Sequence, residues 1–138
     1  MIFTKTQHLT PPPQPSLPIL EKAKSIYKNW IKIHHNIPRT ERFGIGTKTD
    51  ILFLELLELL RKTVYASINE KIKILEEAIS ALDSLRFFVQ LLWETKLISN
   101  GHYAVLGTDI ESLGKMIGGW RKGLLNKTSA IQAEERKE

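Results

Sequence analysis

Large apolar residues recur every three or four positions in four successive segments of this chain. That spacing places them along one side of an α-helix, and no run of β-branched residues shows the alternation of a strand. Four helices joined by short connections pack as a bundle with consecutive helices antiparallel. The sequence therefore predicts an all-α, antiparallel up-down four-helix bundle, with helices over about 16–36, from between 41 and 47 to 67, over 69–96 and over 102–125.

The two ends of the chain differ from its helical part. Residues 1–15 hold Pro11, Pro12, Pro13 and Pro15, which predict an extended or disordered arm. Residues 126–138 are polar and predict a disordered tail, which leaves one bundle domain over 16–125. Cysteine is absent, the start lacks a signal-peptide pattern, and charged residues interrupt every apolar stretch before about 18 residues. These features favour a cytoplasmic protein without a membrane contact.

Positive charge is concentrated in the first third of the chain. The net charge is +5, and residues 1–50 carry eight lysines and arginines against three acidic residues. The later parts are close to neutral, with six against seven over 51–100 and six against five over 101–138. A localised excess of this kind is what an anion-binding surface requires.

The first predicted helix carries a ladder of basic residues beside its apolar stripe. Lys24, Lys28, Lys32 and His35 fall within an arc of about 80° when successive residues are turned by about 100°. One interpretation is a solvated lysine face. The other is a stripe that follows nucleic-acid phosphates, binding tightly but with little sequence preference. Tyr27 and Trp30 lie toward the core and are expected to pack there.

A basic junction follows this helix. Pro38 cannot continue the helix and biases Ile37 away from helical dihedrals. Arg39, Arg42 and Lys48 then cluster between the first two helices, so one end of the molecule is expected to be strongly positive.

The fourth predicted helix contains glycines in its interior. Gly114, Gly118 and Gly119 interrupt an apolar period that continues through them, although glycine costs up to about 1 kcal/mol relative to alanine at such positions. They predict a close backbone approach to a neighbouring helix or a ligand. Arg121 and Lys122 follow and complete the candidate nucleic-acid-binding set: Lys24, Lys28, Lys32, His35, Arg39, Arg42, Lys48, Arg121 and Lys122.

The second predicted helix is apolar around most of its circumference. Eight of the ten residues over 51–60 are large and apolar, whereas a bundle helix needs a stripe of about 100°. Either the helix is central with a broad core face, or its outer face packs against another subunit. We expect the second, a homo-oligomer, and the residues predicted for its interface are Leu52, Phe53, Leu56, Leu59 and Leu60.

The familiar catalytic patterns fail on spacing. Residues 44–49 resemble a phosphate loop, but only one residue separates Gly44 from Gly46 and Thr47 stands before Lys48. No glutamate has a histidine three residues later, as di-iron bundles need, and adjacent His34 and His35 diverge by about 100° on a helix. We therefore expect no enzyme, no metal, no cofactor and no small-molecule substrate.

Four short patterns follow one another between residues 37 and 120. They are Ile37-Pro38-Arg39-x-x-Arg42-Phe43-x-x-Gly46 with the Leu-Glu-Leu-Leu helix after it, Leu82-Asp83-x-Leu85-Arg86-Phe87, Leu97-Ile98-Ser99-x-x-x-Tyr103, and Leu113-Gly114-Lys115-Met116-Ile117-Gly118-Gly119-Trp120.

In this order the patterns resemble the accessory variability determinant (Avd) proteins of diversity-generating retroelements, within a wider superfamily of small bacterial four-helix bundles. The resemblance implies a positively charged, barrel-shaped homopentamer without catalytic activity. It also implies two partners, the reverse transcriptase of the retroelement and its template RNA or the DNA copied from it, during mutagenic retrohoming.

Two other function classes stay open from the sequence. The first is an oligomeric scaffold whose basic face meets an acidic protein surface and no nucleic acid. The other is a peripheral membrane protein. It is the least favoured of the three functions, because no exposed aromatic rim accompanies the basic helix face.

Overall fold

A computed structural model describes residues 16–137 and is all-helical over that range. Its elements are α2 (Ser16–His35), α3 (Arg39–Glu41), the π-helical turn η1 (Arg42–Gly46), α4 (Thr47–Tyr65), α5 (Ile68–Glu94) and α6 (Asn100–Lys137). Because α3 and η1 lead without a break into α4, the described chain forms four long helical rods, as predicted. The proline-rich arm expected over 1–15 lies outside the described residues.

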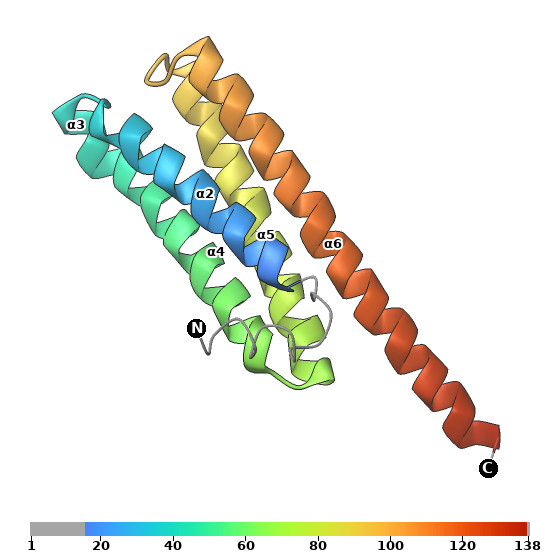
Figure 1. Ribbon diagram of the computed structural model, residues 1–138. Coiled ribbons are helices and arrows are strands. Elements are labelled where there is room, and N and C mark those ends of the chain that lie inside the picture. The colour runs from blue at the N-terminus through green and yellow to red at the C-terminus, as the bar shows by residue number, and fades with distance from the viewer. Residues whose placement is uncertain (1–15, 138) are drawn as a thin grey trace, which may run out of the picture.

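The four rods run up and down beside one another (Figure 1). Helix α2 packs against α4 and α6, and α5 packs against the same two helices from the opposite side. The α2–α4 junction and the α5–α6 turn lie at one end of the bundle, and α6 extends well beyond the other end (Figure 1). No helix in the described part of the chain has the length and apolarity to cross a membrane.

The core is built from the residues that the three-to-four spacing identifies. Trp30 is fully buried and stacks on Phe53, with ring centroids 5.3 Å apart, which joins α2 to α4. On the other side of the core, Leu85 of α5 and Leu106 of α6 are also fully buried. Each buried leucine contributes about 1.5–3 kcal/mol relative to an exposed one, so a single continuous core stabilises the bundle.

Local polar groups decide where the helices begin and end. The Ser67 hydroxyl accepts a hydrogen bond from the Glu70 amide at 3.4 Å, and the Ser99 hydroxyl accepts one from the His102 amide at 3.0 Å. These two serines are the N-caps of α5 and α6. Helix α5 ends at Glu94, and two residues later Lys96 has a φ of 63°, a value that is usual for glycine. The Leu97 amide then donates to the Leu92 carbonyl at 2.9 Å.

Helix α4 buries a different set of side chains from the predicted subunit interface. Leu52, Phe53, Leu56 and Leu60 are at most 6% exposed and belong to the core of the protomer itself, and Leu59 is half-buried. The expectation that these five residues form an outer face is therefore wrong. The outer face carries Ile51 and Leu54, which are 44% and 46% exposed, beside Glu55 and Glu58.

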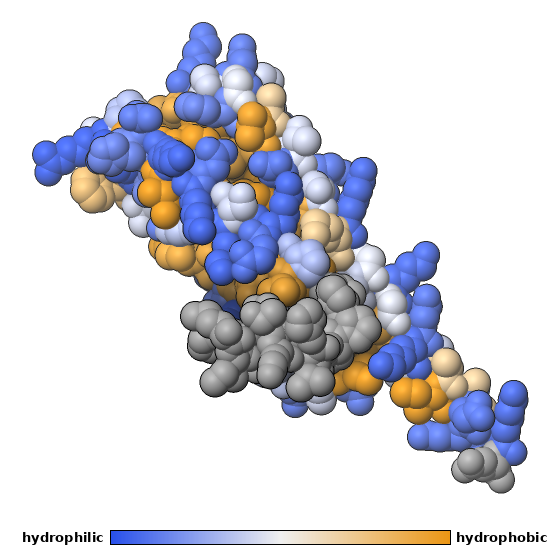
Figure 2. Space-filling view, viewed as in Figure 1, coloured by the Kyte–Doolittle hydropathy of each residue, from blue (hydrophilic) through white to orange (hydrophobic). Residues whose placement is uncertain are grey.

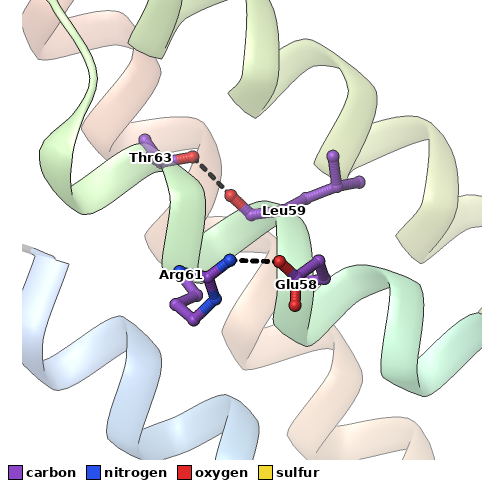
Figure 3. Close-up of polar contacts among 4 residues, drawn as sticks. All are labelled: Glu58, Leu59, Arg61 and Thr63. Atoms are coloured by element: carbon purple, nitrogen blue, oxygen red, sulfur yellow. Dashed lines mark hydrogen bonds and ion pairs between the residues drawn. The ribbon is translucent and has the colours of Figure 1, made fainter.

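Two polar side chains in the later part of α4 find their partners within the helix. The buried Thr63 hydroxyl donates to the Leu59 carbonyl at 2.7 Å, and Glu58 pairs with Arg61 on the surface (Figure 3). Hydrogen bonding to Arg61 lowers the pKa of Glu58.

The predictions for the fourth helix need two corrections. A Cβ at Gly114 would lie 3.1 Å from a Leu82 methyl carbon, which confirms a close approach of α5, but a Cβ at Gly118 or Gly119 would meet nothing within 4 Å. The prediction of a disordered tail after residue 125 is also wrong, since α6 continues to Lys137. Beyond the bundle the side chains of α6 are mostly exposed, so local helix propensity rather than core packing maintains this extension.

Candidate functional site

The basic ladder lies on the outer face of α2. Lys24, Lys28, Lys32 and His35 are exposed, opposite the buried Trp30. Lys24 pairs with Glu21 at 3.2 Å, whereas the other three form no ion pair with a described residue. Hydrophilic side chains project over α2 and the junction, with apolar ones between them (Figure 2). Lys28 and Lys32 therefore present charge to solvent, and His35 lies beside them.

The junction brings two arginines to the end of this ladder. Ile37 is fully buried and Pro38 begins the next helical segment, so the chain reverses within a few residues. Arg42 folds back, and its Nε donates to the Ile37 carbonyl at 3.0 Å. Arg39 stays exposed and forms no ion pair with a described residue. Arg42 is thus held at the C-terminal end of α2, next to the last ladder residues.

A shallow hollow of about 550 Å³ lies at this end of α2. Cationic side chains reach it from both sides of the junction, and its lining is Ile31, Lys32, His34, His35, Asn36 and Arg42. A concave surface bounded by lysine and arginine suits an anionic group, because the charges converge on one point.

A partly buried polar cluster joins α2 to α4 near the junction. The Tyr27 hydroxyl and the Trp30 indole both donate to Asp50 Oδ1, at 3.0 and 3.1 Å. Burial, together with the hydrogen bond to Asp50, raises the pKa of Tyr27 to about 12. The expectation that Tyr27 and Trp30 pack in the core is confirmed. Asp50 is one of three carboxylates in α4, with Glu55 and Glu58, and only the docking of α2 distinguishes it from the other two.

Close packing also restrains the π-helical turn η1. The His34 ring stacks on Trp30 with centroids 5.1 Å apart. A Cβ at Gly46 would lie 2.9 Å from His34 Nε2, so only glycine fits without a shift. The Thr47 hydroxyl donates to the Arg42 carbonyl at 2.8 Å, which satisfies an acceptor in the wider turn. These contacts hold the backbone of η1 in place beneath the basic residues.

Three of the predicted site residues lie elsewhere. Asp50 faces α2, and Lys48 lies about 200° around α4 from it. Lys48 therefore points away from the ladder. Arg121 lies about 30 Å along α6 from its start, near the opposite end of the bundle. Its guanidinium faces α5, where it pairs with Glu76 at 3.4 Å, and Lys122 is its exposed neighbour.

We name the gathered residues the junction face: Lys28, Lys32, His35, Arg39 and Arg42. This surface can bind anions by charge and hydrogen bonding. Over residues 16–137, no three histidine, aspartate or glutamate side chains lie where they could hold one metal ion.

Comparisons with known proteins agree with this architecture. A protein of unknown function from the S23 ribosomal protein family of Bacteroides thetaiotaomicron superposes with a TM-score of 0.73, over 79% of this chain and 99% of that chain. At 14% identity, this similarity supports the fold alone. No curated protein matches the sequence. The sequence profile of the bAvd-like family matches residues 17–124, which span nearly the whole bundle, and the chain therefore belongs to the bAvd-like family.

Proposed function

We propose that this protein is a non-catalytic accessory protein of a diversity-generating retroelement that binds template RNA, or the DNA copied from it, through the junction face. The single observation that carries the proposal is the convergence of five basic side chains from α2 and the junction on one end of the bundle. Within the described structure, no carboxylate forms an ion pair with any of the five. Lysines and arginines that have no acidic partner are free to neutralise phosphates, and this face holds two of each.

Association with a reverse transcriptase is the second part of the proposal, and membership of the bAvd-like family supports it. The identity of the neighbouring gene tests this part. A reverse transcriptase encoded beside this gene would support the assignment. If no such gene is present, the assignment would change to the wider superfamily of bacterial four-helix bundles.

We further propose that the protein acts as a ring-shaped homo-oligomer, a pentamer by resemblance to Avd proteins. The exposed Ile51 and Leu54 of α4 support a subunit contact in place of the interface predicted from the sequence. Repetition of the junction face around a ring would strengthen RNA binding through avidity. Light scattering at micromolar concentration tests this part, and a monomer would refute it.

The direct experiment is RNA binding followed by fluorescence anisotropy over a range of salt concentrations. Affinity that falls steeply with salt and weakens when junction-face charges are removed supports the proposal. Binding that does not depend on these charges favours the second candidate, an oligomeric scaffold that contacts other proteins. The apolar outer face of α4 is the observation that favours that candidate.

A further inference from the structure

Phe43 is an exposed aromatic side chain within the basic end of the molecule. It is 71% exposed and stands directly after Arg42 at the start of η1. Over residues 35–48 the only carboxylate is Glu41, against Arg39, Arg42 and Lys48. An aromatic ring that lies in water among cations contributes nothing to the core, and it is accessible to a ligand that is both anionic and planar.

The helical path sets Phe43 beside a cation. Arg39 and Phe43 are four residues apart on one unbroken helical segment, so they lie about one turn apart on the same face. Arg39 is exposed like Phe43 and forms no ion pair with a described residue. The pair therefore offers a ring and a positive charge to the same ligand.

The ring also stands on a restrained backbone. Gly46 is packed against His34, and the hydroxyls of Thr47 and Thr49 donate to the carbonyls of Arg42 and Ile45, both at 2.8 Å. Holding the backbone in place lowers the entropy lost when a ligand stacks on the side chain.

We propose that Phe43 is a stacking platform for an unpaired base, with Arg39 and the other junction-face cations on the adjoining phosphates. The junction face would then select single-stranded nucleic acid. Stacking needs an exposed base face. A single strand with unpaired bases exposes these faces, whereas a duplex buries them between neighbouring base pairs. This inference rests on the proposed function and adds to it the class of nucleic acid that the site takes.

A second copy of this chain is the competing occupant of Phe43. The nearest exposed apolar residues on α4 are Ile51 and Leu54, and carboxylates stand next to them at Glu55 and Glu58. Around Phe43 the neighbours are arginines instead. Burying that charge against an identical surface would set like charges together, so charge complementarity favours an anionic strand.

The test compares Phe43→Ala with Phe87→Ala, a control that removes another exposed phenylalanine from α5. The probes are a single-stranded oligouridylate of about 20 nucleotides and an RNA duplex of equal length, each measured by fluorescence anisotropy. We expect Phe43→Ala to weaken single-strand binding by about 5- to 100-fold, with duplex binding within about 2-fold of the parent. Phe43→Trp should bind the single strand at least as well as the parent, and Phe87→Ala should match it on both probes.

Equal losses on both probes, or no loss on either, would overturn the stacking role. A Phe43→Ala protein of reduced mass in light scattering would overturn it in favour of a subunit contact. A variant that lacks Arg39 and Arg42 distinguishes failure of the stacking inference from failure of the proposed function. If that variant weakens binding while Phe43→Ala does not, only the stacking inference fails, whereas a parent protein that binds neither probe refutes both.

Discussion

The charge of the junction face yields a quantitative prediction about salt. Each phosphate that a cation neutralises on a single strand contributes about −0.7 to the slope of log affinity against log salt. Counting the two lysines and two arginines of the junction face, we expect a slope of about −2.8. Between about 50 and about 200 mM salt, the dissociation constant should then rise about 50-fold.

The perturbation is the double variant Arg39→Ala with Arg42→Ala. It halves the number of charges, so we expect a slope of about −1.4 and a rise of about 7-fold over the same range of salt. The assay is anisotropy of a labelled single-stranded RNA, with circular dichroism to compare helicity and melting. Since Arg42 also bonds the Ile37 carbonyl, a second variant, Lys32→Ala with Arg39→Ala, removes two charges without disturbing that contact.

Arg136→Ala with Lys137→Ala is the matched control, because it removes the same charge from the exposed end of α6. We expect its salt slope to equal that of the parent. If the control lowers the slope as much as the junction variants do, binding follows net charge rather than the junction face. That result would refute the reasoning.

Three further predictions concern stability. Gly46→Ala should lower the free energy of unfolding by about 1–3 kcal/mol, because the new Cβ would lie 2.9 Å from the His34 ring. Gly44→Ala should raise the free energy of unfolding by about 0.5–1 kcal/mol, because a Cβ there meets nothing within 4 Å. Urea titrations measure both changes. The raised pKa of Tyr27, about 12 against 10.0, means that the unfolded chain loses its proton first. Stability should therefore fall as pH rises from about 10 to about 12, and fall less in Tyr27→Phe, in thermal melts over that range. Lys96→Gly should raise the free energy of unfolding by about 1 kcal/mol, because glycine adopts the positive φ of 63° without strain; an unchanged or lower value would contradict this account.

Several features of the fold can be read directly from local sequence. The three-to-four spacing locates all four helices, because each must turn one apolar stripe toward a common core. Pro38 and Ser99 mark helix boundaries for reasons that lie within a few residues: proline lacks an amide hydrogen, and serine caps one. The basic ladder is also local, since its members share one face of one helix.

Local sequence does not reveal which way a helix faces when its apolar residues surround it. In α4 the spacing of the apolar residues does not show that Leu52 and Phe53 are buried while Ile51 and Leu54 are exposed. Only the packing of α4 between α2 and α5 buries the first pair and exposes the second. The same packing turns Lys48 away from α2, and the direction of α6 carries Arg121 to the far end of the bundle.

By itself, then, the sequence determined four helices, a sharp break at Pro38 and a basic face on the first helix, because periodicity, capping and charge act over a few residues. The tertiary structure decided which cations from other segments lie near that face and which lie elsewhere. It set Gly46 against His34, paired Asp50 with Tyr27 and Trp30 of α2, and buried Leu52 and Phe53 while leaving Ile51 exposed. These contacts depend on how one helix docks on another, and that geometry is settled by the packing of the whole core.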